Sequence, residues 1–599
     1  MSDAPMADLP SPSAGPPAPA EQPAPASPAG SGSRIGHNFA KAALLIAVLT
    51  VFARIAGFGR NVVFANTVGQ TCLGQTYQTV NTVPNIIFEI VAGGALASVV
   101  VPLLSSAITR GDREHASKTS SALVTWALSV LAPIALLVAL FAEPITRLLL
   151  GGSQCDGAVT AGATMLRIFA PQIVLYGVGV VLTGILQAHR KFGGPAFAPL
   201  LSSLVVIAAY VTFAVVAGRG ATLQQTSASE QLILSLGTTL GVVALSGSLL
   251  VPLRGTGLRF RPTYRFPPGV ARRAAAMAAS GVAGLLAQQC AVIVSLVLTN
   301  QQGVPTASIN VFVYAQTIYL LPWAILAVPI ATSVFPKLSE DADAGDMRGF
   351  RLRFGNATDS IVAFSGIATA ALIAAAAEIA YVYVRSAPGE PSVHSLTDGI
   401  VGFTVGLVGY SLFAIGSRAL FALGDARGNA IAAVGGWGLV VVAGIALSFI
   451  LPKGQRVAAL TWGNAIGVTV LGIALLVTVG VKAGRRVAAD VTSALATGVA
   501  AVAVGLVTKW VTLPGPLQID SDSSIWAGFL AGGLRGLIAV VVCGVILFVL
   551  PGSPIRGLVA RRRKGAQEPH DAYERSHSQS ETTQSDTAQP DPSTNERTP

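Results

Sequence analysis

The chain has 599 residues, of which 52% are hydrophobic and only 11% are charged, and its formal net charge is +11. Soluble domains carry about 25% charged residues, so this composition excludes an ordinary soluble fold and indicates a membrane protein, whose apolar side chains are solvated by lipid. The basic residues occur in short segments between apolar runs, which is typical of membrane topology, and we expect no nucleic-acid partner.

Both ends of the chain differ from its centre. The first 33 or so residues are mainly Pro, Ala, Ser and Gly, and they lack the basic region and short apolar core of a cleaved signal peptide. The C-terminal tail is basic and then polar. Because such segments cannot bury enough apolar surface to fold, we predict disorder over 1–38 and over 553–599.

Between these tails lie about fourteen apolar runs, most of them near the roughly 20 residues that a helix needs to span a bilayer. The sequence therefore predicts an all-α integral membrane protein, in which the proline-containing second and eighth helices are kinked. The predicted spans are 41–66, 82–107, 120–146, 160–187, 195–217, 230–252, 272–299, 306–335, 356–384, 396–423, 429–451, 456–480, 489–511 and 525–550.

The loop charges predict the orientation of these spans. An even number of spans puts both termini on one side. With the N-terminus inside, the inner loops contain nineteen Lys and Arg residues and the outer loops contain five, and the basic tail is also inside. The positive-inside rule thus predicts a multi-pass protein of the inner (plasma) membrane with both termini cytoplasmic. The five predicted outer residues are Arg147, Arg219, Arg385, Lys453 and Arg456.

Two pairs of segments indicate an internal repeat. Ala97–Ser105 resembles Ala331–Ser339, and Ala142–Glu143 resembles Ala377–Glu378, with six predicted helices between the members of each pair. Because six is even, the repeats share one orientation and predict two six-helix lobes, with a substrate path between them. The predicted domains are 39–255 and 256–486 for the lobes and 487–552 for two additional transmembrane helices.

Ionised side chains within the predicted spans are candidate functional residues, because a charge near the bilayer centre costs roughly 3 kcal/mol on insertion scales. The first span contains Arg54, predicted to line a polar cavity, and Arg60, which either lines it or extends to the interface. Glu89 is the main deep acid and could pair with an arginine. The excess of deep basic residues favours an anionic substrate such as a phosphate or pyrophosphate.

The sequence contains no recognisable catalytic or metal-binding motif. It has no P-loop, GxSxG or HExxH pattern, so we predict no enzymatic activity, no catalytic residue and no cofactor. The four cysteines form no CxxC pair and no metal site is predicted. Cys72 and Cys155 fall in predicted outer loops, where they either form a disulfide or remain free.

Several motifs occur in the order and spacing of one known family. The chain resembles the MurJ/MviN family of lipid II flippases over about residues 40 to 550, and its composition and tails indicate an actinobacterial member. This family belongs to the larger group of multidrug, oligosaccharidyl-lipid and polysaccharide exporters. The segments that carry the resemblance are Ala53–Arg60 (family S-R-x-x-G-F-x-R), Val83–Asn85 (L-P-N), Ala92–Leu96 (A-E-G-A-F), Pro195–Pro199 (P-A-F-A-P), Tyr314–Ala315 with the run to Pro336, and Arg418–Asp425.

The resemblance implies a fourteen-helix fold with a central cavity, alternating access, and export of the undecaprenyl-linked peptidoglycan precursor lipid II. Besides the lipid-linked substrate, the partners that we consider are membrane lipids and cell-wall synthesis or division proteins. Substrate-binding residues are predicted to be Arg54, Arg60, Asn85, Glu89 and Gln316.

The chain departs from the family pattern at three places, and its cation cluster is thinner. The arginine expected after the Pro-Asn pair is Phe88, followed by Glu89. The Asp-Arg pair of the eighth helix is Gln316–Thr317, and an aspartate of the second helix is Gln75.

Three other functions remain open from the sequence. The first is a flippase for another polyprenyl-linked saccharide, with the same fold. The second is an ion-coupled drug exporter, which the scarcity of deep carboxylates disfavours. The third is a non-transporting membrane scaffold that recruits cell-wall synthesis proteins through its basic loops and tails.

Overall fold

The computed structural model describes residues 32–90, 100, 103–104, 107–266, 270–389, 392–484, 487–511, 523–549 and 555–556, with backbone alone for 32–47, 270–281 and 487–488. The chain up to Val48 forms a unit apart from Leu49–Pro599, and the contacts below all lie within the latter. Regular structure in the described residues is helical, apart from one isolated bridge between Gln70 and Gly389. The all-α fold class is therefore confirmed.

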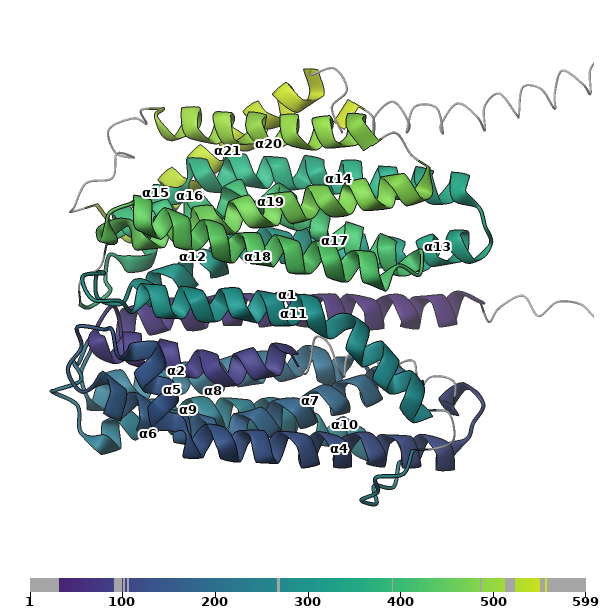
Figure 1. Ribbon diagram of the computed structural model, residues 1–599, viewed down its shortest axis with the longest axis horizontal. Coiled ribbons are helices and arrows are strands. Elements are labelled where there is room, and N and C mark those ends of the chain that lie inside the picture. The colour runs from purple at the N-terminus through teal and green to yellow at the C-terminus, as the bar shows by residue number, and fades with distance from the viewer. Residues whose placement is uncertain are drawn as a thin grey trace, which may run out of the picture. The chain divides into compact units, whose positions relative to one another are not determined.

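The first lobe contains the helices that appear purple to blue in Figure 1. Within it, α4 packs on α7, α8 packs on α9, and α2 packs on α6. The bounds are α1 Gly32–Thr67, α2 Cys72–Glu89, α4 Arg113–Leu140, α5 Ala142–Leu150, α6 Ala158–Phe169, α7 Pro171–Ala188, α8 Gly193–Val216, α9 Ala228–Ser248 and α10 Leu250–Arg254.

The second lobe follows in teal and green, and its central helix, α19, contacts α16, α17 and α18. The last two helices, α20 and α21, pack on α14, and α21 also packs on α15. The bounds are α11 Val270–Thr299, α12 Ser308–Pro322, a π-helical turn Trp323–Ala327, α13 Val328–Asp343, α14 Met347–Ala374, α15 Ala376–Val384, α16 Val393–Val405, α17 Leu407–Ala422, α18 Ala426–Ile450, a 3-10 turn Lys453–Gln455, α19 Arg456–Ala483, α20 Val487–Lys509 and α21 Ile525–Val549.

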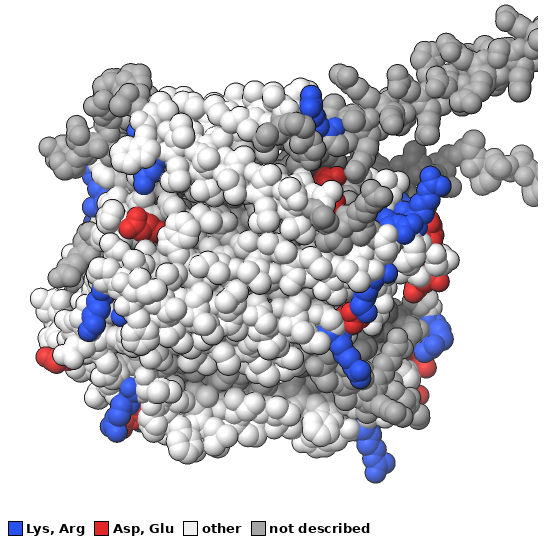
Figure 2. Space-filling view, turned by 45° about the horizontal axis from the view of Figure 1, so that its top comes forward, with Lys and Arg blue, Asp and Glu red and all other residues white. Residues whose placement is uncertain are grey.

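Among the described residues, twelve helices are long and apolar enough to cross a membrane, and the bent pair α16–α17 makes up to thirteen. Each coincides with one predicted span. The remaining span, 82–107, includes residues 91–99, which lie outside the described part, as does most of the repeat segment Ala97–Ser105. On the face in Figure 2, charged residues lie towards the two ends and the surface between them is almost uncharged, as a bilayer requires.

The repeat between the lobes is visible in two interrupted helices. The chain leaves the helical conformation at Phe141, between α4 and α5, with φ −93° and ψ 20°. It does the same at Ala375, between α14 and α15, with φ −95° and ψ 5°. The Ala-Glu pairs that suggested the repeat, Ala142–Glu143 and Ala377–Glu378, follow these two breaks.

Two helices begin earlier than predicted. α1 starts at Gly32, inside the range 1–38 for which we predicted disorder. α2 starts at Cys72 instead of residue 82, where the Thr71 hydroxyl caps the helix by accepting from the Gly74 N–H. Hydropathy missed this start because the first turns of α2 contain polar residues that face the protein interior, including Gln75 and Thr79.

Candidate functional site

A polar cavity of about 300 Å³ lies between the two lobes. Helices α1, α2, α7, α8 and α9 of the first lobe line one side, and α11 and α12 of the second lobe line the other. Helix α2 contributes Gln78, Asn81, Thr82 and Asn85, whose spacing of three and four residues places them on one helical face. That face presents amide and hydroxyl groups to the cavity.

Arg60 is the charged residue among those that line this cavity. It lies within electrostatic range of Tyr77, Tyr176 and Tyr210 in the first lobe and of Tyr383 in the second. The Tyr77 and Tyr210 hydroxyls are 2.8 Å apart and bond to each other. The cavity therefore combines one fixed guanidinium group with neutral polar groups, an arrangement suited to an anion that also carries hydroxyls or amides.

The second lobe contributes amide and hydroxyl groups next to Arg60. Gln316 and Thr317 of α12 line the cavity. The Asn61 Nδ2 donates to Thr317 Oγ1 over 2.9 Å, so the residue after Arg60 links the two lobes at the cavity wall. The described residues contain no group of three or more His, Cys, Asp or Glu side chains that could hold a metal ion.

The structure brings three of the five predicted site residues together. Arg60, Asn85 and Gln316 all line the cavity, whereas Arg54 and Glu89 are not among its lining residues. Arg54 is exposed on α1, and six helical residues place it about 9 Å from Arg60 along the axis. The arginine of α1 that lines the cavity is therefore Arg60 and not Arg54.

Glu89 ends α2 and its side chain is exposed. It lies close enough to Tyr410 on α17 of the second lobe for the two groups to interact electrostatically. Among the described residues, Glu89 forms no ion pair with Arg54 or Arg60. Glu89 therefore lies outside the set of residues that line the cavity.

The sequence analysis missed several lining residues. Asn61, Gln78 and Asn81 could have been found, because polar side chains recur beside Arg60 and at three-residue steps in α2. Tyr176 and Tyr210 could not, because they come from α7 and α8, and no local pattern shows which distant helices meet.

Buried amides join the lobes beyond the cavity, and we call Gln75, Thr79, Asn300 and Ala307 the amide seam. Gln75 Nε2 donates to Asn300 Oδ1 over 2.8 Å, and Gln75 Oε1 accepts from the Ala307 N–H over 2.7 Å. Asn300 Nδ2 also donates to Thr79 Oγ1 over 3.1 Å. These four residues are at most 3% exposed. Because buried polar groups left unpaired are costly, the seam stabilises contact between the lobes at this end.

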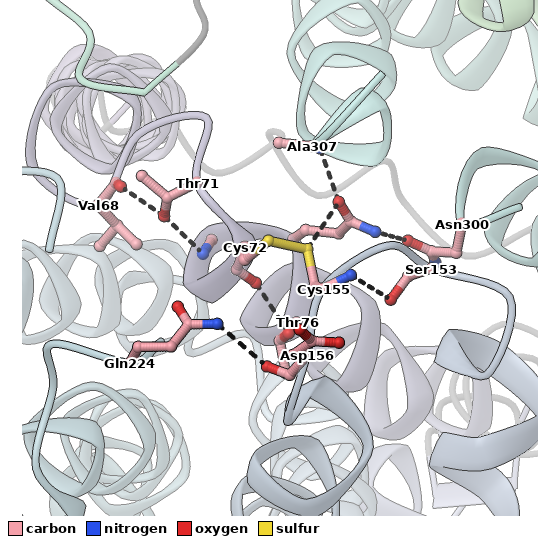
Figure 3. Close-up of a disulfide and its surroundings, with 12 residues drawn as sticks. Val68, Thr71, Cys72, Thr76, Ser153, Cys155, Asp156, Gln224, Asn300 and Ala307 are labelled. Carbon is pink, nitrogen blue, oxygen red and sulfur yellow. Dashed lines mark hydrogen bonds between the residues drawn. A yellow bond between two sulfur atoms is a disulfide. The ribbon is translucent and has the colours of Figure 1, made fainter. Parts of the chain in front are cut away.

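A disulfide between Cys72 and Cys155 lies beside the seam, which decides the alternative that the sequence left open. Figure 3 shows the sulfur atoms close to Asn300 and Ala307, and Cys155 Sγ is 3.9 Å from Gln75 Oε1. Arg219 adds a further link between the lobes at this end by donating to the carbonyls of Asn66 and Ser386.

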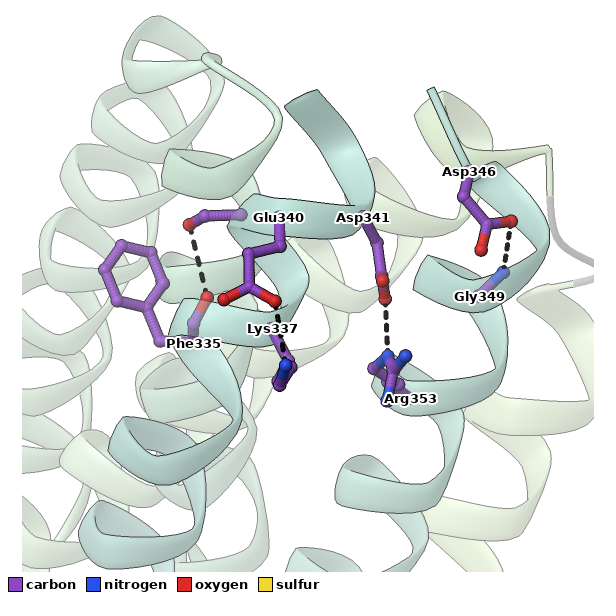
Figure 4. A network of polar contacts seen from close by, with 8 residues as sticks. Phe335, Lys337, Glu340, Asp341, Asp346, Gly349 and Arg353 are labelled. Atoms are coloured by element: carbon purple, nitrogen blue, oxygen red, sulfur yellow. Dashed lines mark hydrogen bonds and ion pairs between the residues drawn. The ribbon is translucent and has the colours of Figure 1, made fainter. Parts of the chain in front are cut away.

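The opposite end of the second lobe is rich in paired charges. Figure 4 shows Lys337 beside Glu340 and Arg353 beside Asp341, at 2.9 and 2.7 Å, where α13 turns into α14. These pairs hold the α13–α14 connection together within one lobe. The described hydrogen bonds between the lobes lie instead at the disulfide end and beside the cavity.

A family model described as lipid II flippase MurJ matches residues 64–519. The chain belongs to the lipid II flippase MurJ family. A lipid II flippase MurJ of Burkholderia cenocepacia is 28% identical over 348 residues, which are 55% of this chain and 64% of that protein. A probable lipid II flippase MurJ of a Synechocystis species is 26% identical over 410 residues, 67% of this chain and 74% of its own length. The match thus spans just under two thirds of the Burkholderia relative.

Solved structures support the same fold. A lipid II flippase MurJ in an inward closed conformation matches with a TM-score of 0.64 at 20% identity, covering 84% of this chain and 99% of its own. An inward-facing MATE-family multidrug transporter matches with a TM-score of 0.60 at 14% identity, covering 74% and 98%. Membership of the MurJ family therefore confirms the resemblance found in the sequence.

Proposed function

We propose that this chain moves lipid II from the cytoplasmic to the outer leaflet by alternating access. The observation that carries the proposal is the cavity between the lobes, in which Arg60 is surrounded by amides and hydroxyls. Arginine binds phosphate oxygens through its forked donors, and amides bind sugar hydroxyls and peptide groups. A headgroup of sugars and peptide joined to a pyrophosphate matches both kinds of group.

The proposed roles of the site residues follow their positions. Arg60 holds the pyrophosphate, while Asn85 and Gln316 contact the sugar and peptide part of the headgroup. Arg54 and Glu89 lie outside the cavity. They guide either the headgroup as it approaches the cavity or the movement of the lobes. No covalent bond changes in this process, so the residues act by binding and positioning.

The amide seam supports a proposal for the side from which the substrate enters the cavity. Because the lobes are bonded across the disulfide end, the cavity in this state receives substrate from the opposite end. Rocking of the lobes about the cavity then breaks the seam and exposes the site on the disulfide side. The seam residues Gln75 and Asn300 thus act as the gate of that side.

We propose that the lipid tail occupies an apolar groove of about 410 Å³ lined by α17, α19 and α20. Its walls include Leu412, Trp462 and Leu506, and its polar lining is slight. Hydrocarbon in this groove remains in a lipid-like environment while the headgroup crosses. Of the two additional helices at 487–552, α20 lines this groove and therefore serves the tail and not the headgroup.

The disulfide supports the predicted orientation with both termini cytoplasmic. Disulfides persist in oxidising compartments, so we infer that Cys72 and Cys155 lie outside the plasma membrane. Arg147, Arg219, Arg385, Lys453 and Arg456 were assigned to the outer side on charge alone. Arg219 bonds to Asn66 and Ser386 at this disulfide end, which supports that assignment.

Lipid titrations test the proposed substrate. Purified protein is titrated with lipid II, with an undecaprenyl pyrophosphate carrying a different saccharide, and with undecaprenol. We expect lipid II to bind tightest and undecaprenol weakest. Equal affinity for the other saccharide would favour a flippase for that polymer, and failure of all three to bind would favour the scaffold function.

A further inference from the structure

The connection between the lobes contains an extended segment that the transport cycle described above does not use. Residues 257–266 leave α10 and run beside the N-terminal half of α4, as Figure 1 shows below α4. We call this segment the strap. It contains three arginines, Arg259, Arg261 and Arg265, and no acidic residue.

A ladder of hydroxyl groups on α4 holds the strap by its backbone. The N–H groups of Arg259, Arg261 and Thr263 donate to Ser117 Oγ, Ser121 Oγ and Thr125 Oγ1 over 3.2, 3.1 and 3.2 Å. Four helical residues advance about 6 Å and two extended residues about 6.6 Å, so the two spacings match. The strap is thus attached through its backbone to hydroxyl groups spaced four residues apart along α4. The arginine side chains take no part in these bonds.

An aromatic pair marks the far end of the strap. The rings of Trp126 and Tyr264 are 5.5 Å apart, Trp126 Nε1 donates to the Tyr264 carbonyl, and the Tyr264 hydroxyl bonds to Ser129. Beyond Trp126, α4 exposes large apolar side chains, including Leu136 and Leu137. Trp and Tyr concentrate at the headgroup level of membranes, so the strap lies in the headgroup layer and the apolar surface lies in hydrocarbon.

The three arginine side chains remain available to a ligand. All three are exposed, and in the part of the chain that the structure describes no ion pair or hydrogen bond engages their guanidinium groups. The nearest acids on α4 have partners of their own, because Glu114 pairs with Lys118 at 2.7 Å and Asp112 caps the helix. Phe260, between two of the arginines, is 40% exposed.

We propose that the strap is a binding site for the headgroups of anionic phospholipids in the leaflet at this end of the first lobe. Guanidinium groups pair with phosphates in a forked geometry, and basic residues near a membrane attract anionic lipids. Phe260 and Tyr264 contact the upper part of the acyl chains. The site anchors the first lobe to the membrane and is independent of whether the central cavity carries lipid II.

Site-specific photocrosslinking tests the site. Benzoylphenylalanine replaces Phe260 in the full chain, reconstituted in vesicles of equal phosphatidylglycerol and phosphatidylcholine. We expect crosslinks to phosphatidylglycerol to exceed those to phosphatidylcholine about tenfold, and the excess to fall at high salt. The same probe at Phe449, which is 85% exposed on α18, should show no preference.

Two variants distinguish a site from general charge attraction. Arg259→Gln with Arg261→Gln should abolish the excess at Phe260, whereas Arg348→Gln with Arg427→Gln, which removes the same charge from the second lobe, should leave it unchanged. Ser117→Ala with Ser121→Ala keeps every arginine but releases the strap, and should also reduce the excess. Equal crosslinking of both lipids at Phe260, an excess that survives loss of the two strap arginines, or crosslinks mainly to protein would overturn the proposal.

Discussion

Arg60 sits where a single positive charge has the greatest effect, in a cavity whose other lining residues are neutral. Its neighbours Asn61, Gln78 and Asn81 supply hydrogen-bonding groups but no charge to neutralise it. An anionic group entering the cavity would therefore meet one uncompensated guanidinium. This makes substrate binding more dependent on one residue than a cluster of arginines would be.

Arg60→Ala should abolish support of growth in cells that depend on this protein. A hydrogen-bonded charge contributes about 2 kcal/mol, which corresponds to roughly a 30-fold loss in binding. Arg60→Lys keeps the charge but loses the fork and should support growth partially. Colony counts after depletion of the resident copy measure the effect.

The control is Arg348→Ala, which removes an exposed arginine at the start of α14, outside the cavity. It should support growth fully at the same protein level. Full growth with Arg60→Ala would refute the role of Arg60.

Asp425 provides a pH-dependent test of stability outside the membrane spans. The Gly428 N–H and then Lys482 lower the pKa of this carboxyl, which caps α18. Because the pKa of Asp425 is lower in the folded state than in the unfolded state, its ionised carboxylate stabilises the folded protein fully at pH values above the unfolded-state pKa. This stabilisation is lost as the pH falls through the folded-state pKa. Asp425→Ala should therefore cost about 1 kcal/mol near pH 7 and nothing well below pH 4. Thermal unfolding in detergent at several pH values measures this, and a difference independent of pH would contradict it.

At the scale of elements, the disulfide and the seam secure the same end of the molecule. The disulfide closes a sequence separation of 83 residues within the first lobe. The Gln75 amide, which touches Cys155, then crosses to the second lobe. The disulfide thus fixes the surface of the first lobe that the second lobe contacts at this end.

Cys72→Ser with Cys155→Ser should lower the thermal unfolding temperature, because disulfides typically contribute about 2–4 kcal/mol. Cys290→Ser, at an exposed free cysteine, is the matched control and should have little effect. In intact cells, an impermeant maleimide should label Cys72 and Cys155 only after reduction. Labelling that requires cell lysis would contradict the proposed orientation.

Gln75→Ala should open the disulfide end more often. It leaves the Ala307 N–H and the Asn300 Oδ1 without the buried partner that Gln75 supplies, at about 1–3 kcal/mol each. Spin labels at the exposed positions Gln224 and His394, one in each lobe, should report a larger share of long distances than in the parent chain.

Gln302→Ala is the control for that experiment, because its exposed side chain lies near the same end but outside the seam. It should leave the distance distribution unchanged. An unchanged distribution for Gln75→Ala would show that the seam does not hold the lobes together.

At the scale of the whole molecule, the membrane class and thirteen of the fourteen predicted spans match the described helices, because lipid imposes both length and apolarity on each span. The early start of α2 escaped hydropathy because its polar face lines the interior. Arg60, Asn85 and Gln316 could be predicted from motifs, whereas Tyr176 and Tyr210 depend on which distant helices pack together. The strap could not be predicted either, since its ladder joins Ser117 to a segment more than a hundred residues away.

The most direct test of the central claim is the accessibility of lipid II to a degrading enzyme added outside cells that depend on this protein. With the parent chain, the account predicts that the enzyme destroys lipid II. With Arg60→Ala at a normal protein level, or after depletion, lipid II should remain intact inside. Normal destruction of lipid II after depletion, in cells without a second flippase, would contradict lipid II transport by this protein.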